Sequence, residues 1–284
     1  MMSLEVTDGK AITEDQDLAP GGAVMRRPMA VALLVTMAGV GFFALQRRAA
    51  LLQWMPQLLE VLPRGRNRAI EPAPAGWPLS RHEENLAVTA SADPELLLLG
   101  DSLTDFWRDT AGPTAGAAAL QRHFGNWRIV NFGISGDATQ GLLWRLQNGE
   151  GRGFAPRAVM LMIGTNNIGH DTVEEIGAGV AAVVQQVRLS FPQARVLLLG
   201  VLPRASARAP VRRTVAALNQ RIAKLDDGHW VFYRDIGALF TDADGNIPAA
   251  LMSDGIHPGP QGYEVWAQAV AGPLADLMVG QAPR

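Results

Sequence analysis

The stretch ELLLLGDSLT (95–104) decides the fold of this chain. A run of four leucines ends in Gly100, and polar residues follow at once. Short apolar runs of this kind are typical of strands that are buried on both faces of a parallel sheet. Four further runs have the same character: 127–132, 158–163, 195–201 and 230–233. Together these runs predict a five-stranded parallel sheet.

Segments with helical periodicity lie between the predicted strands. The clearest covers 172–190, where Thr172 and Glu175 have the spacing of a capping box at its start. A last helix over 261–278 is expected to kink at Pro273. This alternation predicts an α/β fold in which helices cover both faces of the sheet, a three-layer sandwich. In a flavodoxin-like strand order, the first and third strands would be neighbours.

The N-terminal part has a different composition. Residues 1–27 are polar and acidic, which predicts a disordered tail. Residues 28–46 (PMAVALLVTMAGVGFFALQ) are uncharged, are flanked by arginine pairs and are long enough to cross a membrane as a helix. We interpret them as a transmembrane anchor, with a signal peptide and a buried core helix as the alternatives. Residues 47–76 indicate an amphipathic segment and a linker, so the folded domain is expected over 77–284.

Polar residues gather after the predicted strands, where ligands bind in sheets of this kind. Ser102 follows the first strand, Gly136 lies after the second and Asn166 after the third. Asp254 and His257 stand before the last helix. Each has an ordinary structural explanation when taken alone, such as a helix cap or a turn. Their occurrence together predicts an active site.

These residue types suit attack on an ester. A serine hydroxyl needs a base that takes its proton, and His257 is the candidate, with Asp254 holding its tautomer. Backbone N–H groups of Ser102 and Gly136, with the side-chain amide of Asn166, would stabilise the negative oxygen that forms. Glycine is expected at 136 because a side chain there would crowd the reacting carbonyl.

The surrounding blocks resemble those of the SGNH (GDSL) hydrolase superfamily, above all the platelet-activating-factor acetylhydrolase catalytic subunits and their bacterial relatives. The matching segments are GDSLT (100–104), NFGISGDATQGLLWRLQNGE (131–150), IGTNN (163–167), LLGVLPR (198–204) and SDGIHPGPQGYEVWA (253–267), with SRHEENLA (80–87) upstream. The resemblance covers about 77–277. Asn167 stands where many members carry Asp, although the acetylhydrolase-like branch shares GTNN.

The resemblance implies an SGNH hydrolase fold and a serine esterase that hydrolyses short acyl esters, acetyl above all, without a metal or other cofactor. We expect O-acetyl groups on a carbohydrate or polysaccharide as the substrate, because no long insertion provides a lid and an exported domain would meet acetylated glycans. An O-acyltransferase of the same fold and a non-catalytic glycan- or partner-binding module are the alternatives. The turn GDSLT lacks the glycines of a dinucleotide site.

The expected location is the inner membrane, with a single anchor and the catalytic domain in the periplasm. Basic residues after the 28–46 segment are at least as many as those before it, so charge does not fix the orientation. The formal net charge of -2 shows no excess of basic residues of the kind that nucleic-acid binding requires. With no cysteine and five scattered histidines, no metal site is expected. The oligomeric state is left open.

Overall fold

The computed structural model describes residues 67–74, 76–205 and 209–279. The predicted tail (1–27) and the predicted anchor (28–46) lie outside the described residues and stay predictions. Among the helices of the described part, none combines the length and the apolarity that crossing a membrane requires.

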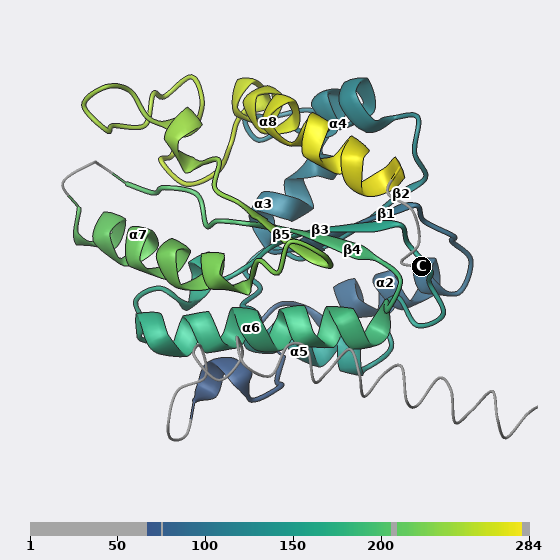
Figure 1. Cartoon of the computed structure of the whole chain (residues 1–284). Coiled ribbons are helices and arrows are strands. Elements are labelled where there is room, and N and C mark those ends of the chain that lie inside the picture. The colour runs from purple at the N-terminus through teal and green to yellow at the C-terminus, as the bar shows by residue number, and fades with distance from the viewer. Residues whose placement is uncertain (1–66, 75, 206–208, 280–284) are drawn as a thin grey trace, which may run out of the picture. The chain divides into compact units, whose positions relative to one another are not determined.

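Five parallel strands form one sheet in the order β2-β1-β3-β4-β5 (Figure 1). The strands are β1 (Leu96–Gly100), β2 (Ile129–Gly133), β3 (Ala158–Met162), β4 (Arg195–Leu199) and β5 (Val231–Arg234). β1 pairs with both β2 and β3, which confirms the parallel sheet and its predicted neighbours. The strand order reverses between β1 and β3, and in sheets of this kind ligands bind beyond the carboxyl ends of the strands at such a point.

Two predicted strands extend two residues beyond an end of the observed ones. Trp127 donates its N–H to the carbonyl of Phe124 in the preceding helix, so β2 starts later. At the other end, Val201 donates its N–H to the side chain of Asn219, and β4 ends before it. In both places a group outside the sheet accepts the backbone N–H, which is then not available for a hydrogen bond to a neighbouring strand.

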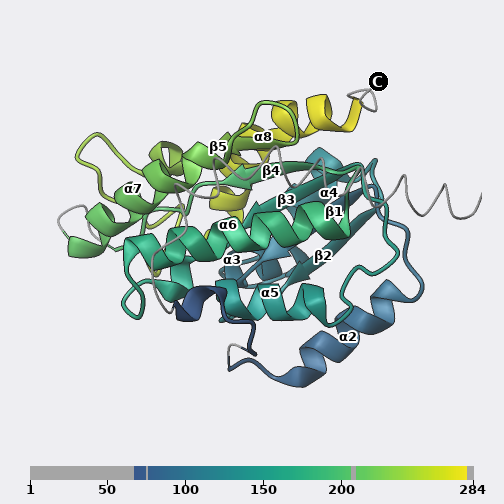
Figure 2. The same cartoon turned by 60° about the horizontal axis from the view of Figure 1, so that its bottom comes forward.

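One face of the sheet is covered by α5 (Thr139–Gln147), α6 (Val173–Ser190) and α7 (Pro210–Ile222), with α2 (Leu79–Thr89) beside α5 (Figure 2). Alternate strand residues, such as Leu97 and Leu99 of β1, point into this layer. The predicted capping box of α6 is confirmed: the Thr172 hydroxyl accepts the N–H of Glu175, whose carboxylate accepts the N–H of Thr172.

The opposite face is covered by α3 (Ser102–Asp105), α4 (Ala117–Phe124) and α8 (Pro260–Val279). Leu96 and Leu98 point to this side, where the rings of Trp107, Tyr263 and Trp266 pack together. Pro273 lies inside α8, which continues past it. Helices therefore cover both faces, as predicted. The short 3₁₀ turns are η2 (Phe106–Arg108), η3 (Thr165–Asn167), η4 (Ala223–Leu225) and η5 (Gly237–Phe240).

A further 3₁₀ turn, η1 (Arg68–Ile70), falls inside the segment predicted as a linker. The side chain of Asn67 donates to the carbonyl of Glu175 in α6 at 3.0 Å. The hydroxyl of Thr139 in α5 donates to the carbonyl of Ala69 at 2.8 Å. The packed domain therefore includes residues upstream of the expected start at Trp77.

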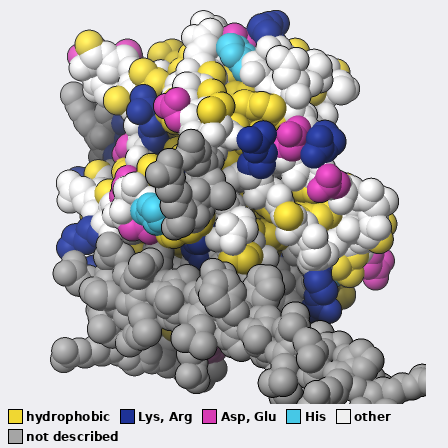
Figure 3. Space-filling view, turned by 45° about the vertical axis from the view of Figure 1, so that its right-hand side comes forward, with side chains coloured by type: hydrophobic (Ala, Val, Ile, Leu, Met, Phe, Trp, Pro, Cys, Tyr) yellow, Lys and Arg dark blue, Asp and Glu magenta, His cyan; other side chains and the backbone are white. Residues whose placement is uncertain are grey.

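The surface carries charges of both signs. In the view of Figure 3, basic and acidic side chains are interspersed over the described part of the face, with apolar side chains between them. This distribution agrees with the small formal net charge of -2 for the whole chain.

Candidate active site

Ser102 is the first residue of α3, separated from the end of β1 by Asp101 alone, and is 6% exposed. Asp101 caps this helix: its side chain accepts the N–H of Leu103 at 3.0 Å. Gly100 is required at the end of β1, because a Cβ there would lie 2.1 Å from Oγ1 of Thr104 and 2.4 Å from the carbonyl oxygen of Met162. The chain can therefore turn sharply against β3 and carry Ser102 to the carboxyl edge of the sheet.

A hydrogen-bonded chain runs from Ser102 through His257 to Asp254. Oγ of Ser102 lies 3.0 Å from Nε2 of His257, and Nδ1 of His257 lies 2.6 Å from Oδ2 of Asp254. An ionised carboxylate only accepts hydrogen bonds, so Nδ1 carries the proton and Nε2 is left to accept the serine hydroxyl. This is the tautomer that a general base for Ser102 requires.

The loop around Asp254 keeps its carboxylate charged. Burial alone would raise the pKa of Asp254, but hydrogen bonds from the backbone and side chain of His257 and from the backbone of Ile256 lower that pKa below its usual range. The side chains of His257 and Asp254 are 25% and 50% exposed. The ring of Phe106 packs against the imidazole, with centroids 5.2 Å apart.

Asn166 is linked to the loop of Gly136 by a hydrogen bond to Asp137, the residue that follows Gly136 in the chain. The side-chain amide of Asn166, in η3, donates to the carbonyl oxygen of Asp137 at 2.8 Å. Gly136 has a φ of 81°, and a Cβ on it would meet no atom of the protein within 4 Å. The backbone conformation by itself therefore favours glycine at this position, and the expected crowding of a bound ester stays a prediction.

A buried charged network lies behind this loop. Arg145 of α5 contacts the carboxylates of Asp137 and Glu150, and all three side chains are 0% exposed. Its guanidinium also donates to the carbonyl of Phe132 at 2.9 Å. Trp77 donates to Asp137 at 2.8 Å from the other side. We did not predict this network. Its one sequence signal is an arginine within the apolar run GLLWRL (141–146).

Further residues support the loop after β3. Asn167 accepts the N–H of Thr139 at 3.0 Å, and its amide donates to Asp171 at 2.9 Å. Arg204, from the segment after β4, donates to the carbonyl of Thr165 at 3.1 Å. Among the described residues, no three His, Asp or Glu side chains are grouped so as to hold a metal ion.

Comparisons with known proteins agree with this geometry. Residues 98–265 match the GDSL-like Lipase/Acylhydrolase family. The human platelet-activating factor acetylhydrolase IB subunit alpha1 is 33% identical over 225 residues, which cover 75% of this chain and 91% of that protein.

Solved structures share the fold. A protein from Streptococcus pneumonia named as a platelet activating factor has a TM-score of 0.58 and 25% identity, over 69% of this chain and 91% of that one. A GDSL-like lipase from Bacteroides thetaiotaomicron has a TM-score of 0.55 and 18% identity, over 70% and 99%. The chain therefore belongs to the GDSL-like lipase/acylhydrolase family and is an ester hydrolase of the SGNH type.

Proposed function

We propose that the protein is a serine esterase that removes short acyl groups, acetyl above all, through an acyl-enzyme on Ser102. The observation that carries this proposal is the continuous chain of hydrogen bonds from Oγ of Ser102 through His257 to Asp254. Serine esterases need a nucleophile, a base and a group that orients the base, and these three side chains meet that need.

The reaction then has two halves. In the first, Nε2 of His257 takes the proton of Ser102 while Oγ attacks the ester carbonyl, and the same nitrogen returns the proton to the leaving alcohol. In the second, His257 takes a proton from water, the hydroxide attacks the acyl-enzyme, and the acid leaves as Oγ regains its proton. Asp254 stays ionised throughout, and its lowered pKa supports this role.

Three donors are available for the oxygen that becomes negative in each half. They are the backbone N–H groups of Ser102 and Gly136 and the side-chain amide of Asn166. An amide nitrogen carries two hydrogens, so Asn166 can bond Asp137 with one and the substrate oxygen with the other. Loss of one such donor typically lowers the rate on the order of 10²–10³-fold.

We propose O-acetyl groups on a carbohydrate or polysaccharide as the substrate. The acetylhydrolase names of the relatives support acetyl as the acyl part. The partial exposure of His257 and Asp254 supports a bulky alcohol part, because such a group can approach the base from solvent. The proposed setting, a periplasmic domain on an inner-membrane anchor, rests on the composition of residues 28–46.

The test compares the full chain with Ser102→Ala on p-nitrophenyl acetate, butyrate and octanoate. Ser91→Ala is the matched control, since Ser91 is exposed and its hydroxyl bonds only carbonyls of α2, the helix that ends just before it. We expect acetate release that is lost in Ser102→Ala and kept in Ser91→Ala. Turnover that survives in Ser102→Ala would reject the proposed nucleophile.

A second panel of acetylated xylan, cellulose acetate and acetylated chitooligosaccharides tests the alcohol part. Hydrolysis of free lipid esters alone, with none of these polymers, would reject the carbohydrate proposal. Release of acetate, as opposed to transfer of acetyl to an added glycan, separates the esterase from an acyltransferase.

A further inference from the structure

Asp105, three residues after the proposed nucleophile, contacts the loop that carries Gly136. Its Oδ2 accepts the backbone N–H of Ser135 at 3.0 Å and the Ser135 hydroxyl at 2.8 Å. The carboxylate is 19% exposed, and Ser135 is an exposed residue. One side chain of α3 thus holds the residue directly before Gly136 by two hydrogen bonds.

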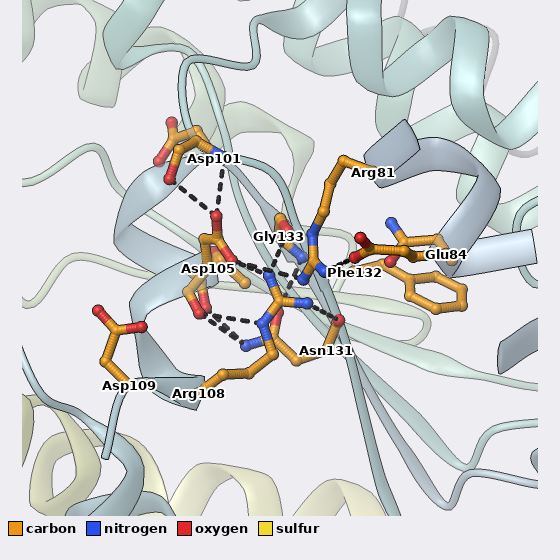
Figure 4. Close-up of polar contacts among 12 residues, drawn as sticks. Arg81, Glu84, Asp101, Asp105, Arg108, Asp109, Asn131, Phe132 and Gly133 are labelled. Atoms are coloured by element: carbon orange, nitrogen blue, oxygen red, sulfur yellow. Dashed lines mark hydrogen bonds and ion pairs between the residues drawn. The ribbon is translucent and has the colours of Figure 1, made fainter. Parts of the chain in front are cut away.

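Arginines hold the carboxylate in place (Figure 4). Oδ1 of Asp105 forms an ion pair with Arg108 and lies 3.7 Å from the guanidinium of Arg81. Arg108 also donates to the carbonyls of Asn131 and Gly133, at 3.2 and 3.0 Å. The arginine therefore fastens the end of β2 to α3 and leaves Oδ2 of Asp105 directed at Ser135.

The two segments also touch through their backbones. A Cβ on Gly133 would lie 2.3 Å from the backbone nitrogen of Asp105. The side chain of Asn131 donates to the carbonyl of Thr104 at 2.7 Å. The start of the loop is thus fixed to the helix that begins with Ser102, while Ser135 and Gly136 themselves are exposed.

The conformation of this loop is a tight turn. Asp137 donates its N–H to the carbonyl of Ile134 at 3.1 Å, and Gly136, at the third position, has a φ of 81°. Ser135, at the second position, does not have a positive φ, so the turn is of type II. A type I turn differs mainly by a flip of the central peptide, which here is the Ser135–Gly136 peptide. That flip would reverse the direction of the Gly136 N–H.

We propose that Asp105 is a positioning residue: by holding Ser135 it fixes the place of the Ser135–Gly136 peptide, so that the Gly136 N–H lies within reach of the reacting oxygen of an ester on Ser102. The inference rests on the proposed function, since it concerns a donor to that oxygen. The two hydrogen bonds hold the N–H and the hydroxyl of Ser135 and so fix where the next peptide begins, while the type II turn sets the direction of the Gly136 N–H.

The test uses the full chain and two substrates, p-nitrophenyl acetate and the matching thionoester, in which sulfur replaces the carbonyl oxygen. Sulfur is a weak hydrogen-bond acceptor, so the thionoester gains little from the donors. We expect Asp105→Ala to lower kcat on the oxygen ester about 10- to 100-fold, to change KM little and to lower turnover of the thionoester much less.

Two further variants complete the test. Ser135→Ala keeps the backbone bond to Asp105 and loses the hydroxyl bond. The selectivity, meaning the ratio of turnover of the oxygen ester to that of the thionoester, should therefore fall in the same way but by a smaller factor. Because Ser135 is exposed, this variant tests the inference even if Asp105→Ala fails to fold. Asp93→Ala is the matched control: it removes an exposed carboxylate that pairs with Arg128 and has no bond to Ser135 or Arg81, so selectivity should not change.

Equal losses on the two substrates, or no loss at all, in a folded Asp105→Ala would overturn the inference while leaving the esterase intact. An unchanged selectivity in Ser135→Ala would overturn it likewise. Absence of turnover in the wild type would reject the proposed function, and this inference with it.

Discussion

Two clusters of ionisable side chains differ in their access to water: the pair of His257 and Asp254, and the network of Arg145, Asp137 and Glu150. The side chains of His257 and Asp254 are 25% and 50% exposed. Arg145, Asp137 and Glu150 are 0% exposed. The first cluster joins residues only three positions apart, whereas the second joins α5 to the loop before it and the turn after it.

The difference shows what each cluster can do. An imidazole that reaches solvent can take up and release protons, and the loss of one neighbour costs little because water replaces it. Buried charges have no such replacement, so they persist only while each keeps its partners. The exposed pair suits proton transfer, and the buried network suits the fixing of a backbone.

The largest effect on activity is expected when the exposed cluster is disrupted. His257→Ala should lower kcat on p-nitrophenyl acetate on the order of 10⁴–10⁶-fold, because Ser102 loses its base. The melting temperature should change little, since a partly exposed side chain is removed. His229→Ala, at an exposed histidine outside the site, is the control and should keep full activity. A His257→Ala variant that retains activity would show that another group serves as the base.

The next largest effect, on stability, is expected when the buried cluster is disrupted. Arg145→Met leaves the carboxylates of Asp137 and Glu150 buried without their cation, and should lower the free energy of unfolding by about 3–5 kcal/mol. Urea denaturation measures this loss. Arg122→Met is the matched control, because Arg122 is 63% exposed in its ion pair with Glu264 and should cost less than about 1 kcal/mol. Similar losses in the two variants would remove the distinction between the clusters.

A smaller effect is expected at Asp101, which is buried and forms no ion pair with a cation of the described part of the chain. Burial, the largest cause, raises its pKa to about 7, and the nearby charge of Asp137 adds to the increase. The unfolded chain releases this proton near pH 4, whereas the folded one holds it until about pH 7. Between these values the folded state binds more protons, so this group's contribution to stability is present at low pH and is lost as the pH rises.

Asp101→Asn removes the carboxyl group whose ionisation lowers the stability as the pH rises. It keeps an oxygen that can accept the N–H of Leu103. The melting temperature of Asp101→Asn should therefore rise relative to that of the wild type as the pH increases from about 5 to 8, by roughly 2–4 °C for each kcal/mol regained. Thermal unfolding at both pH values measures the difference. A constant difference between the two proteins would contradict a raised pKa at Asp101.

Much of the fold was predictable because its signals are local. The apolar runs that become β1 and β3 need no distant partner to be recognised, and the capping box at Thr172 involves residues three apart. The proposed catalytic residues were found because each follows a strand or precedes the last helix in a block that resembles a known family. Their positions within hydrogen-bond reach agree with those assignments, while their roles stay proposals.

The remaining features depend on contacts that no local pattern encodes. Arg145 is stabilised inside the protein by carboxylates whose burial depends on the packing of α2, α5 and the loop after β2. The bond from Ser135 to Asp105 joins residues 30 positions apart, and both are ordinary surface types. The φ of 81° at Gly136, which by itself favours glycine, depends on the turn that the loop forms, and the expected crowding of a reacting carbonyl stays a prediction.

The bond between Ser102 and His257 joins residues 155 positions apart in the chain. During synthesis, therefore, the proposed nucleophile leaves the ribosome long before its proposed base. A chain that stops short of Asp254 and His257 would carry Ser102 without that base, so ester cleavage would begin only once their loop has been made. The separation along the sequence would thus leave unfinished chains without esterase activity.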